Sequence, residues 1–369
     1  MSRNRKQETV AGSVPQWRLM WRRFRRHRLA FFSLWVLCLM YGSALFCEFV
    51  APYGRDQRNA DMVLSPPQRP RFIDRDGRIH LRPFVYPLNR IVAEDGYRWT
   101  WKADTSRRLP LYLFERGYRY KLWGIFPGDI HLFGTRDGRA YLFGTDRNGA
   151  CLFSRILYGA RISLTIGLLG VAITFLLGIT LGGLAGFYGG IIDHVIQRGI
   201  EIIRCVPTLP LWMTLSAALP ASWPPLRIYF GITIIMSFIS WTGLARVIRG
   251  KFLSLREEDF VVAAQVCGTN ELTIIFKHML PSSMSHVIAS ATLAIPGMIL
   301  GEAALSFLGI GLRAPVVSWG VLLQHAQNYQ AVSLAPWLLL PGVFVIVVVM
   351  AFNLVGDGLR DAADPYANM

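Results

Sequence analysis

The chain of 369 residues is 53% hydrophobic and only 17% charged, a composition that excludes an ordinary soluble domain and indicates an integral membrane protein. Its net charge of +16 raises the question of nucleic-acid binding. The charge is concentrated in residues 1–28, with nine basic residues and one acidic residue, and in residues 51–155, with 19 basic and 11 acidic residues. A basic stretch directly before an apolar run indicates contact with anionic lipid and excludes base reading as the main role.

The basic arm, residues 1–28, carries apolar side chains at helical spacing. Trp17, Met20, Trp21 and Phe24 recur every three or four residues, with arginines between them. This pattern predicts an amphipathic helix lying on the inner leaflet of the membrane, so membrane lipid is an expected partner and nucleic acid is not. A disordered basic tail is the alternative.

Apolar windows of about 20 residues, enough for a helix to cross about 30 Å of hydrocarbon, recur six times. They predict an all-α polytopic membrane protein with six transmembrane helices. The predicted spans are Leu29–Phe49, Ile162–Phe187, Ile200–Leu219, Ile228–Val247, Val287–Phe307 and Val332–Val355. The first span follows a basic region too long for a signal peptide, which favours a retained anchor over a cleaved signal. Pro207 and Pro210 predict a kink or break in the third span.

Charges in the short loops set the expected orientation. They place both termini in the cytoplasm, because short cytoplasmic loops carry an excess of Lys and Arg. Residues 50–157 are then exported, and their strand-like pieces, broken by turn dipeptides such as Asp76-Gly77, predict a small, partly β extracytoplasmic insert. We expect a five-helix core over residues 158–356 and a cytoplasmic tail over 357–369.

Small residues recur at every fourth position along and just beyond the second span. These positions are Gly178, Gly182, Gly186 and Gly190. Lipid supplies no hydrophobic drive between helices, and such a stripe lets two helix backbones approach closely. The spacing therefore predicts a helix-packing face.

The loop between the fourth and fifth spans, about residues 248–286, is polar and sharply punctuated. Ser254 and Glu257 have capping-box spacing, which predicts a helix with Glu258 and Asp259 in its first turn. Gly268 predicts the end of that helix, and a second helix is expected from Glu271 to Pro281. Two short helices would then expose a low-relief face at Ala263 and Ala264 that another protein could approach. A connector resting on the bundle is the alternative.

These residues resemble a known motif. Val262-Ala263-Ala264, Gly268 and Leu280-Pro281 are similar to the EAA loop of binding-protein-dependent ABC importer permeases. The wider chain resembles the second permease subunit of the dipeptide and oligopeptide importers. The matching segments, in that family's order, are FGTDRNG, SRILYGARISL, FYGGIIDHVIQR, SLREEDFVVAA, LSFLGIGL and FNLVGDGLRDAADP.

The resemblance implies a type I importer permease in a bacterial inner membrane. It implies a second permease, two cytoplasmic ABC ATPases that bind ATP and magnesium, and an extracytoplasmic solute-binding protein as partners. No cofactor is expected on this chain. Peptides are the implied cargo, with oligosaccharides or metal chelates as alternatives. The loop residues implied to couple the chain to the ATPases are Glu258, Asp259, Val262, Ala263, Ala264, Gly268, Leu280 and Pro281.

Glu302 is an ionisable residue within a predicted span, and Val262, Ala150 and Cys151 depart from the family's motifs. Glu302 lies inside the fifth span, where an ionisable group is costly, so it is a candidate either to line the translocation path or to satisfy helix ends near the outer surface. Val262 replaces the usual glutamate of the EAA triplet, which removes any salt link made by that carboxylate. Ala150 and Cys151 replace an Arg-Asp pair of the family, which puts in doubt a charge contact on the outer surface.

A polytopic membrane enzyme is the competing class. The sequence has no HExxH or GxSxG motif, and its five cysteines show no metal-like spacing. GLARVIRGK departs from a phosphate-binding loop in the spacing of its glycines and in the residue after Lys251. We therefore expect no catalytic, cofactor or metal site and no ATPase activity in this chain.

Overall fold

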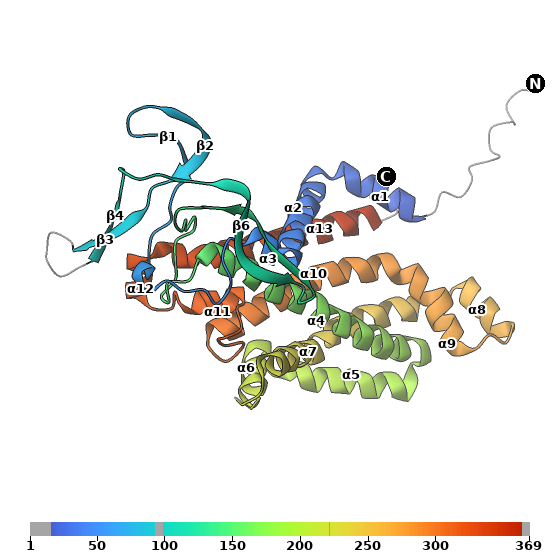
Figure 1. The fold of residues 1–369 in the computed structure, drawn as a ribbon. Coiled ribbons are helices and arrows are strands. Elements are labelled where there is room, and N and C mark those ends of the chain that lie inside the picture. Colours follow the sequence, from blue (N-terminus) through green and yellow to red (C-terminus); the bar gives the residue numbers. More distant parts are fainter. Residues whose placement is uncertain (1–15, 93–98, 221, 364–369) are drawn as a thin grey trace, which may run out of the picture.

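The structure is a computed structural model that describes residues 16–92, 99–220 and 222–363. The first 15 residues of the predicted arm and the last six of the predicted tail lie outside the described residues. The described part is a helical bundle with a small β region at one end (Figure 1).

Five stretches of described helix are long and apolar enough to cross a membrane. They confirm five of the six predicted spans and lengthen several of them. The helices that supply them are α2 (Arg28–Leu45), α4 (Leu152–Tyr188), α7 (Pro225–Leu255), α10 (Leu280–Phe307), and η3 (Pro336–Leu339) followed by α13 (Leu340–Ala363).

The third predicted span is divided between two shorter helices, α5 (Gly190–Cys205) and α6 (Thr208–Ala217). Val206 between them has an extended backbone, with φ −93° and ψ 133°. A residue that precedes proline is disfavoured in the α-helical region, and Pro207 has no N–H to continue the helical hydrogen bonds. The kink or break predicted for this span is therefore a complete break, and the third predicted span is not one of the five long apolar helices in the described residues.

Helix α4 forms the centre of the bundle, and its glycines bring α7 close. A Cβ atom added to Gly182 would lie 2.5 Å from the carbonyl oxygen of Ala245, and one added to Gly186 would lie 2.6 Å from Cβ of Phe252. A Cβ on Gly178 would meet the side chain of Leu244 at 2.9 Å. These three positions are where the two helices pack closely, as small residues allow.

Gly190 does not extend the packing stripe. Helix α4 ends at Tyr188, and Gly190, with φ +55°, begins α5 with nothing within 4 Å of where a Cβ would lie. The predicted stripe therefore stops at Gly186, because the chain turns at Gly189 before the next turn of helix could face α7.

The predicted amphipathic helix of the arm is present as α1 (Gln16–Arg26). Phe24 on α1 is buried against α13, where a Cβ added to Gly358 would lie 2.4 Å from Cβ of Ala30 and 3.3 Å from the Phe24 ring. His27 then starts α2, its Nδ1 accepting a hydrogen bond of 3.1 Å from the backbone N–H of Ala30. The arm is thus packed on the last helix through its apolar side.

The insert is partly β, as predicted. A short helix α3 (Cys47–Val50) and the turn η1 (Ala60–Met62) precede three small antiparallel sheets, ordered β1-β2-β5, β3-β4 and β6-β7. The strands are β1 (Arg71–Ile73), β2 (Ile79–Val85), β3 (Leu88–Val92), β4 (Trp99–Ala103), β5 (Leu109–Pro110), β6 (Tyr112–Leu122) and β7 (Phe126–Gly134).

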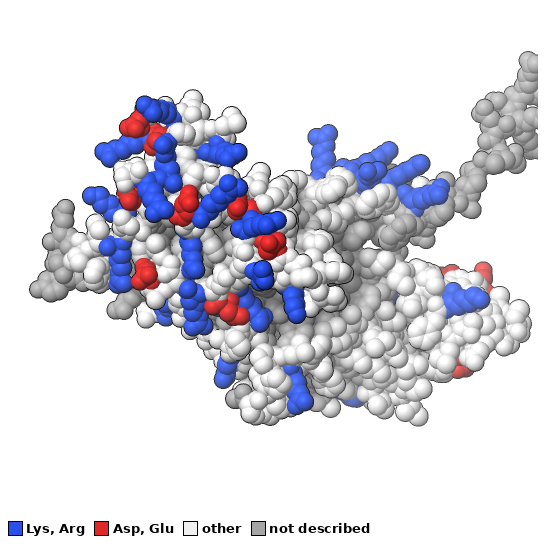
Figure 2. Space-filling view, in the orientation of Figure 1, with Lys and Arg blue, Asp and Glu red and all other residues white. Residues whose placement is uncertain are grey.

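The two polar ends of the molecule lie far apart. The β region, α11 (Trp319–Gln324) and α12 (Tyr329–Leu334) gather at one end, whereas α8 (Asp259–Val266) and α9 (Glu271–Thr273) lie at the other (Figure 1). Lys and Arg side chains gather over the insert and along α1, and the bundle between the two ends is mostly uncharged on the face shown in Figure 2. This distribution fits a bundle crossed by a hydrocarbon layer.

Candidate functional site

The punctuated loop forms a short helix that projects from the bundle. Helix α8 begins after Glu258, whose backbone is extended and whose carbonyl accepts hydrogen bonds from the N–H groups of Val261 and Val262. The predicted capping box is wrong, because Ser254 lies inside α7, which continues to Leu255. Glu258 and Asp259 are exposed at the start of α8, where negative charge suits the helix dipole.

Gly268 ends α8 as predicted. Its φ of +71° is in the left-handed region, and a Cβ there would find nothing within 4 Å. The N–H of Gly268 donates to Gln265 O at 2.9 Å, and the N–H of Thr269 donates to Ala264 O at 3.1 Å, which is the Schellman pattern. Backbone conformation rather than space therefore requires glycine at this position.

The second predicted helix is not a separate element. Asn270 caps α9 by accepting a hydrogen bond of 3.0 Å from the N–H of Leu272, but the chain then passes through a π-helical turn, η2 (Ile274–Met279), directly into α10. Pro281 does not end a helix. It lies in the first turn of α10, where a proline is tolerated, and the wider π turn is bonded instead through the N–H of Leu280 to Ile275 O.

Helix α8 has one buried anchor and a largely exposed surface. Val261 is fully buried in a cluster with Ile248 and Phe252 of α7 and with Ile274 and Ile275 of η2, against which Ala264 and Leu280 pack. Val262 is 45% exposed and Val266 82% exposed, and Ala263 is exposed beside them. A short apolar surface at a polar end of the protein is suited to contact with another protein.

Hydrogen bonds join this region to neighbouring helices. Tyr188 at the end of α4 donates a hydrogen bond of 2.6 Å to the carboxylate of Glu271. Asp193 of α5 accepts two hydrogen bonds from the guanidinium of Arg249 on α7, rather than pairing with its neighbours on α5. Arg198 and Glu201 form an ion pair of 2.7 Å on the exposed face of α5.

Glu302 is fully buried within the subunit. Its carboxylate accepts hydrogen bonds from Ser163 of α4, at 3.0 Å, and from Ser306 one turn along α10, at 2.8 Å. The same Ser163 hydroxyl accepts the N–H of Trp319 at the start of α11, and that of Ser306 accepts the N–H of Leu312. The carboxylate thus orders hydroxyls that satisfy backbone groups after α10. Its role in lining a path stays a prediction, since the side chain has no exposed surface in this conformation.

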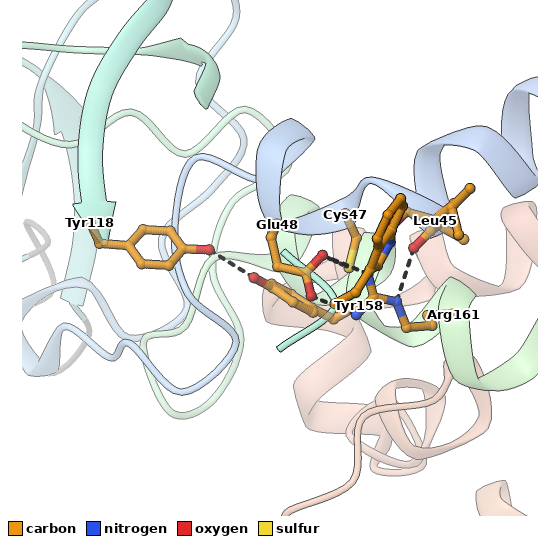
Figure 3. Close-up of polar contacts among 8 residues, drawn as sticks. Leu45, Cys47, Glu48, Tyr118, Tyr158 and Arg161 are labelled. Carbon is orange, nitrogen blue, oxygen red and sulfur yellow. Dashed lines mark hydrogen bonds and ion pairs between the residues drawn. The ribbon is translucent and has the colours of Figure 1, made fainter. Parts of the chain in front are cut away.

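A polar cluster that the sequence reasoning missed lies at the other end of the bundle (Figure 3). Arg161 of α4 donates to both carboxylate oxygens of Glu48 on α3, at 2.6 and 2.5 Å, and to the carbonyl oxygens of Ala44 and Leu45 at the end of α2. Burial raises the pKa of Glu48, but the hydrogen bonds from Arg161 and from the backbone outweigh it and hold that pKa below its usual value.

Tyr118 of β6 extends from the insert to this cluster. Its hydroxyl lies 2.7 Å from that of Tyr158 on α4, and Figure 3 shows the two rings pointing toward each other. Burial raises the pKa of Tyr118 to about 12, so this hydroxyl keeps its proton at neutral pH. Opposite charges at the facing ends of two consecutive apolar runs were the only sequence signal for Glu48 and Arg161, and nothing in the sequence pointed to Tyr118.

Comparisons with known proteins agree with this architecture. The family model described as "binding-protein-dependent transport system inner membrane component" matches residues 178–367, and that of the N-terminal TM domain of oligopeptide transport permease C matches residues 15–67. Over 240 residues, the chain is 42% identical to a dipeptide transport system permease protein of Alkalihalophilus pseudofirmus and 38% identical to an oligopeptide transport system permease protein of Bacillus subtilis. Each alignment covers 65% of this chain and 73% of the relative. A dipeptide transport system permease protein of Lactococcus lactis is 30% identical over 356 residues, 94% of this chain and 90% of the relative.

Proposed function

Because the chain belongs to the family of binding-protein-dependent transport system inner membrane components, we propose that it forms, with a second permease subunit, the path of an ATP-driven peptide importer. The names of the relatives, which are dipeptide and oligopeptide permeases, support peptides as cargo. The same architecture suits an oligosaccharide or a metal chelate. If the intact system took up one of these solutes and not peptides, that solute would become the assigned cargo.

The observation that carries the coupling role is the exposed apolar surface of α8. Val262 and Val266 are accessible, whereas Val261 on the same helix is buried against α7. A partner that binds the exposed surface can therefore move a helix that is fixed to the bundle on its other side. Two cytoplasmic ATPase subunits, which bind ATP and magnesium, are the proposed partners at this surface and at its counterpart on the second permease.

The same arrangement supports the proposed orientation in the membrane. With α8 in the cytoplasm, the insert at the opposite end is extracytoplasmic and faces the solute-binding protein. Both termini are then cytoplasmic, and the arginines of α1 meet the anionic inner leaflet.

The proposed mechanism is a shift between inward-open and outward-open states. Closure of the ATPases moves α8, and Val261 transmits the movement to Ile248 and Phe252 of α7. Helix α7 packs directly against the backbone of α4 at Gly182 and Gly186. Because this close packing hinders sliding of one helix along the other, the two helices move together. The chain itself performs no covalent chemistry on the solute.

Affinity purification from native membranes tests this function. Val266→Arg places a charge on an 82% exposed position without altering a buried contact, and Arg78→Glu, a charge reversal on the exposed tip of the insert, is the control for altered surface charge. We expect the wild type and Arg78→Glu to copurify with a second permease and two ATPases and to support peptide uptake. Val266→Arg should retain the second permease but lose the ATPases and uptake. Full ATPase recovery with Val266→Arg would contradict the coupling role, and recovery of the chain alone in every case would contradict the importer.

A further inference from the structure

One long hairpin of the insert, β6–β7, is attached to the ends of two helices of the bundle. Besides the Tyr118–Tyr158 contact, Trp123 in its turn donates a hydrogen bond of 2.8 Å to Leu45 O at the end of α2. The Trp123 ring packs on Phe46, with 5.7 Å between ring centroids. The hairpin is thus attached at two places to the outer ends of membrane helices.

A cleft of about 740 Å³ lies between this hairpin and the bundle. Its lining combines tyrosines from three elements with apolar side chains at the start of α7 and in the loop before α11. The tyrosines are Tyr118, Tyr120, Tyr158 and Tyr229. The volume is in the range of clefts that hold small ligands, roughly 300–1,000 Å³, and such sites are mostly apolar with a few placed polar groups.

Within the described part of the chain, one cation of the cleft lacks an acidic partner. Glu48 is paired with Arg161, and Asp56 is paired with Arg55 at 3.1 Å. Lys121 at the end of β6 also lines the cleft and has no carboxylate partner among the described residues. The cleft therefore offers the exposed ammonium group of Lys121, unpaired among the described residues, beside tyrosine rings and hydroxyls.

We propose that this cleft is an outer vestibule in which the insert forms one wall, and that it holds a short peptide with its carboxylate at Lys121 and its side chains on the tyrosines. This inference rests on the proposed function, because it says where this subunit receives the cargo. A carboxylate is the group that an unpaired ammonium favours, and tyrosines accept varied apolar side chains without selecting one. The insert would then contribute to solute handling rather than only cover the bundle.

Uptake of two peptides that differ only in a free or an amidated carboxyl terminus tests the contact with Lys121. The assay uses the intact transporter in cells, at peptide concentrations that saturate the binding protein. We expect Lys121→Gln to slow uptake of the free-carboxylate peptide roughly fivefold, the scale of one partly exposed charge-assisted contact, and to leave the amidated peptide unchanged. Lys121→Arg keeps the positive charge and should take up the free-carboxylate peptide at the wild-type rate. Arg119→Gln, on the same strand but outside the cleft lining, removes one charge in the same way and should leave uptake of both peptides unchanged.

Cysteine protection provides a readout independent of rate. Leu226→Cys places a thiol in the cleft at the start of α7, and Arg78→Cys places one on the exposed tip of the insert. Saturating peptide should slow labelling of Leu226→Cys by a membrane-impermeant thiol reagent several-fold and leave Arg78→Cys unaffected, with the wild type correcting for its own five cysteines.

Equal labelling with and without peptide, together with equal effects of Lys121→Gln on both peptides, would overturn the vestibule alone. Failure of the wild type to take up either peptide would overturn the proposed peptide cargo and the vestibule together.

Discussion

Arg161 and Glu48 form a bidentate ion pair that joins the end of α4 nearest the insert to α3, the helix that follows the first span. The guanidinium also donates to two carbonyl oxygens at the end of α2. One side chain thus supplies hydrogen bonds to carbonyl groups that have no partner within the helix. Glu48 is only 8% exposed, and removing its charge would leave Arg161 half-buried and without its counter-charge.

We therefore predict that Glu48→Gln lowers the free energy of unfolding by about 2 kcal/mol, the scale of a charged hydrogen bond lost in a partly buried site. The measurement is the unfolding curve of each variant in detergent, recorded by circular dichroism. Arg198→Gln, which breaks the exposed Arg198–Glu201 pair on α5, is the control and should cost at most about 0.5 kcal/mol. Equal losses in both variants would mean that the Arg161–Glu48 pair adds nothing beyond a surface ion pair.

The same pair predicts an acid limit to stability. Burial acts to raise the pKa of Glu48, but the hydrogen bonds from Arg161 and the backbone lower it further, so the pKa in the folded protein is below the ordinary 4.5. A lowered folded pKa contributes stability that is fully present above pH 4.5 and is lost as the pH falls through the folded pKa. Melting temperatures of wild type and Glu48→Gln should therefore differ at pH 7 and converge in acid below pH 4.5. A constant difference across this range would rule out Glu48 as the titrating group.

Five of the spans and the end of α8 could be predicted from the sequence because their signals are local. Apolar length marks a span, and Gly268 marks a left-handed helix end whatever the surroundings. The sequence did not reveal that Pro281 is absorbed into α10, because the π turn that accommodates it depends on the packing of Ile274 and Ile275 against α7. The capping box failed for a similar reason: burial of Phe252 keeps α7 helical through Ser254.

The polar cluster of Glu48, Arg161, Tyr118 and Tyr158 could not be predicted, since it depends on contacts between distant segments. Tyr118 and Tyr158 lie 40 residues apart, and Glu48 and Arg161 lie 113 residues apart. Neither pair has a periodic pattern, and the strands of the insert are either short, as β1 and β4 are, or largely without buried side chains, as β6 is, so its fold does not follow from alternation. Only the arrangement of the hairpin on the bundle brings these groups into one cleft.

The close approach of α4 and α7 gives a packing prediction. Gly182→Ala would place a Cβ 2.5 Å from the carbonyl oxygen of Ala245, which forces the helices apart. We expect a loss of about 1–3 kcal/mol in the free energy of unfolding, as for other overpacked sites, and slower transport. Gly199→Ala, in α5 with nothing within 4 Å of the new Cβ, should be neutral or slightly stabilising. Unchanged stability of Gly182→Ala would show that the two helices can separate freely.

The left-handed backbone at Gly268 predicts a graded effect on coupling. A Cβ has open space there, so Gly268→Ala costs only the backbone strain of a φ near +71°, about 1–2 kcal/mol, and asparagine tolerates that conformation better. The strain is relieved by loosening the end of α8, which misplaces Val262 and Val266 while the bundle stays intact. ATPase recovery and peptide uptake should therefore fall in the order wild type, Gly268→Asn, Gly268→Ala, at unchanged membrane insertion. Gly250→Ala, at an open position inside α7 where the backbone is helical, should match the wild type. If alanine and asparagine at position 268 behaved alike, the angle set by this glycine would not control docking.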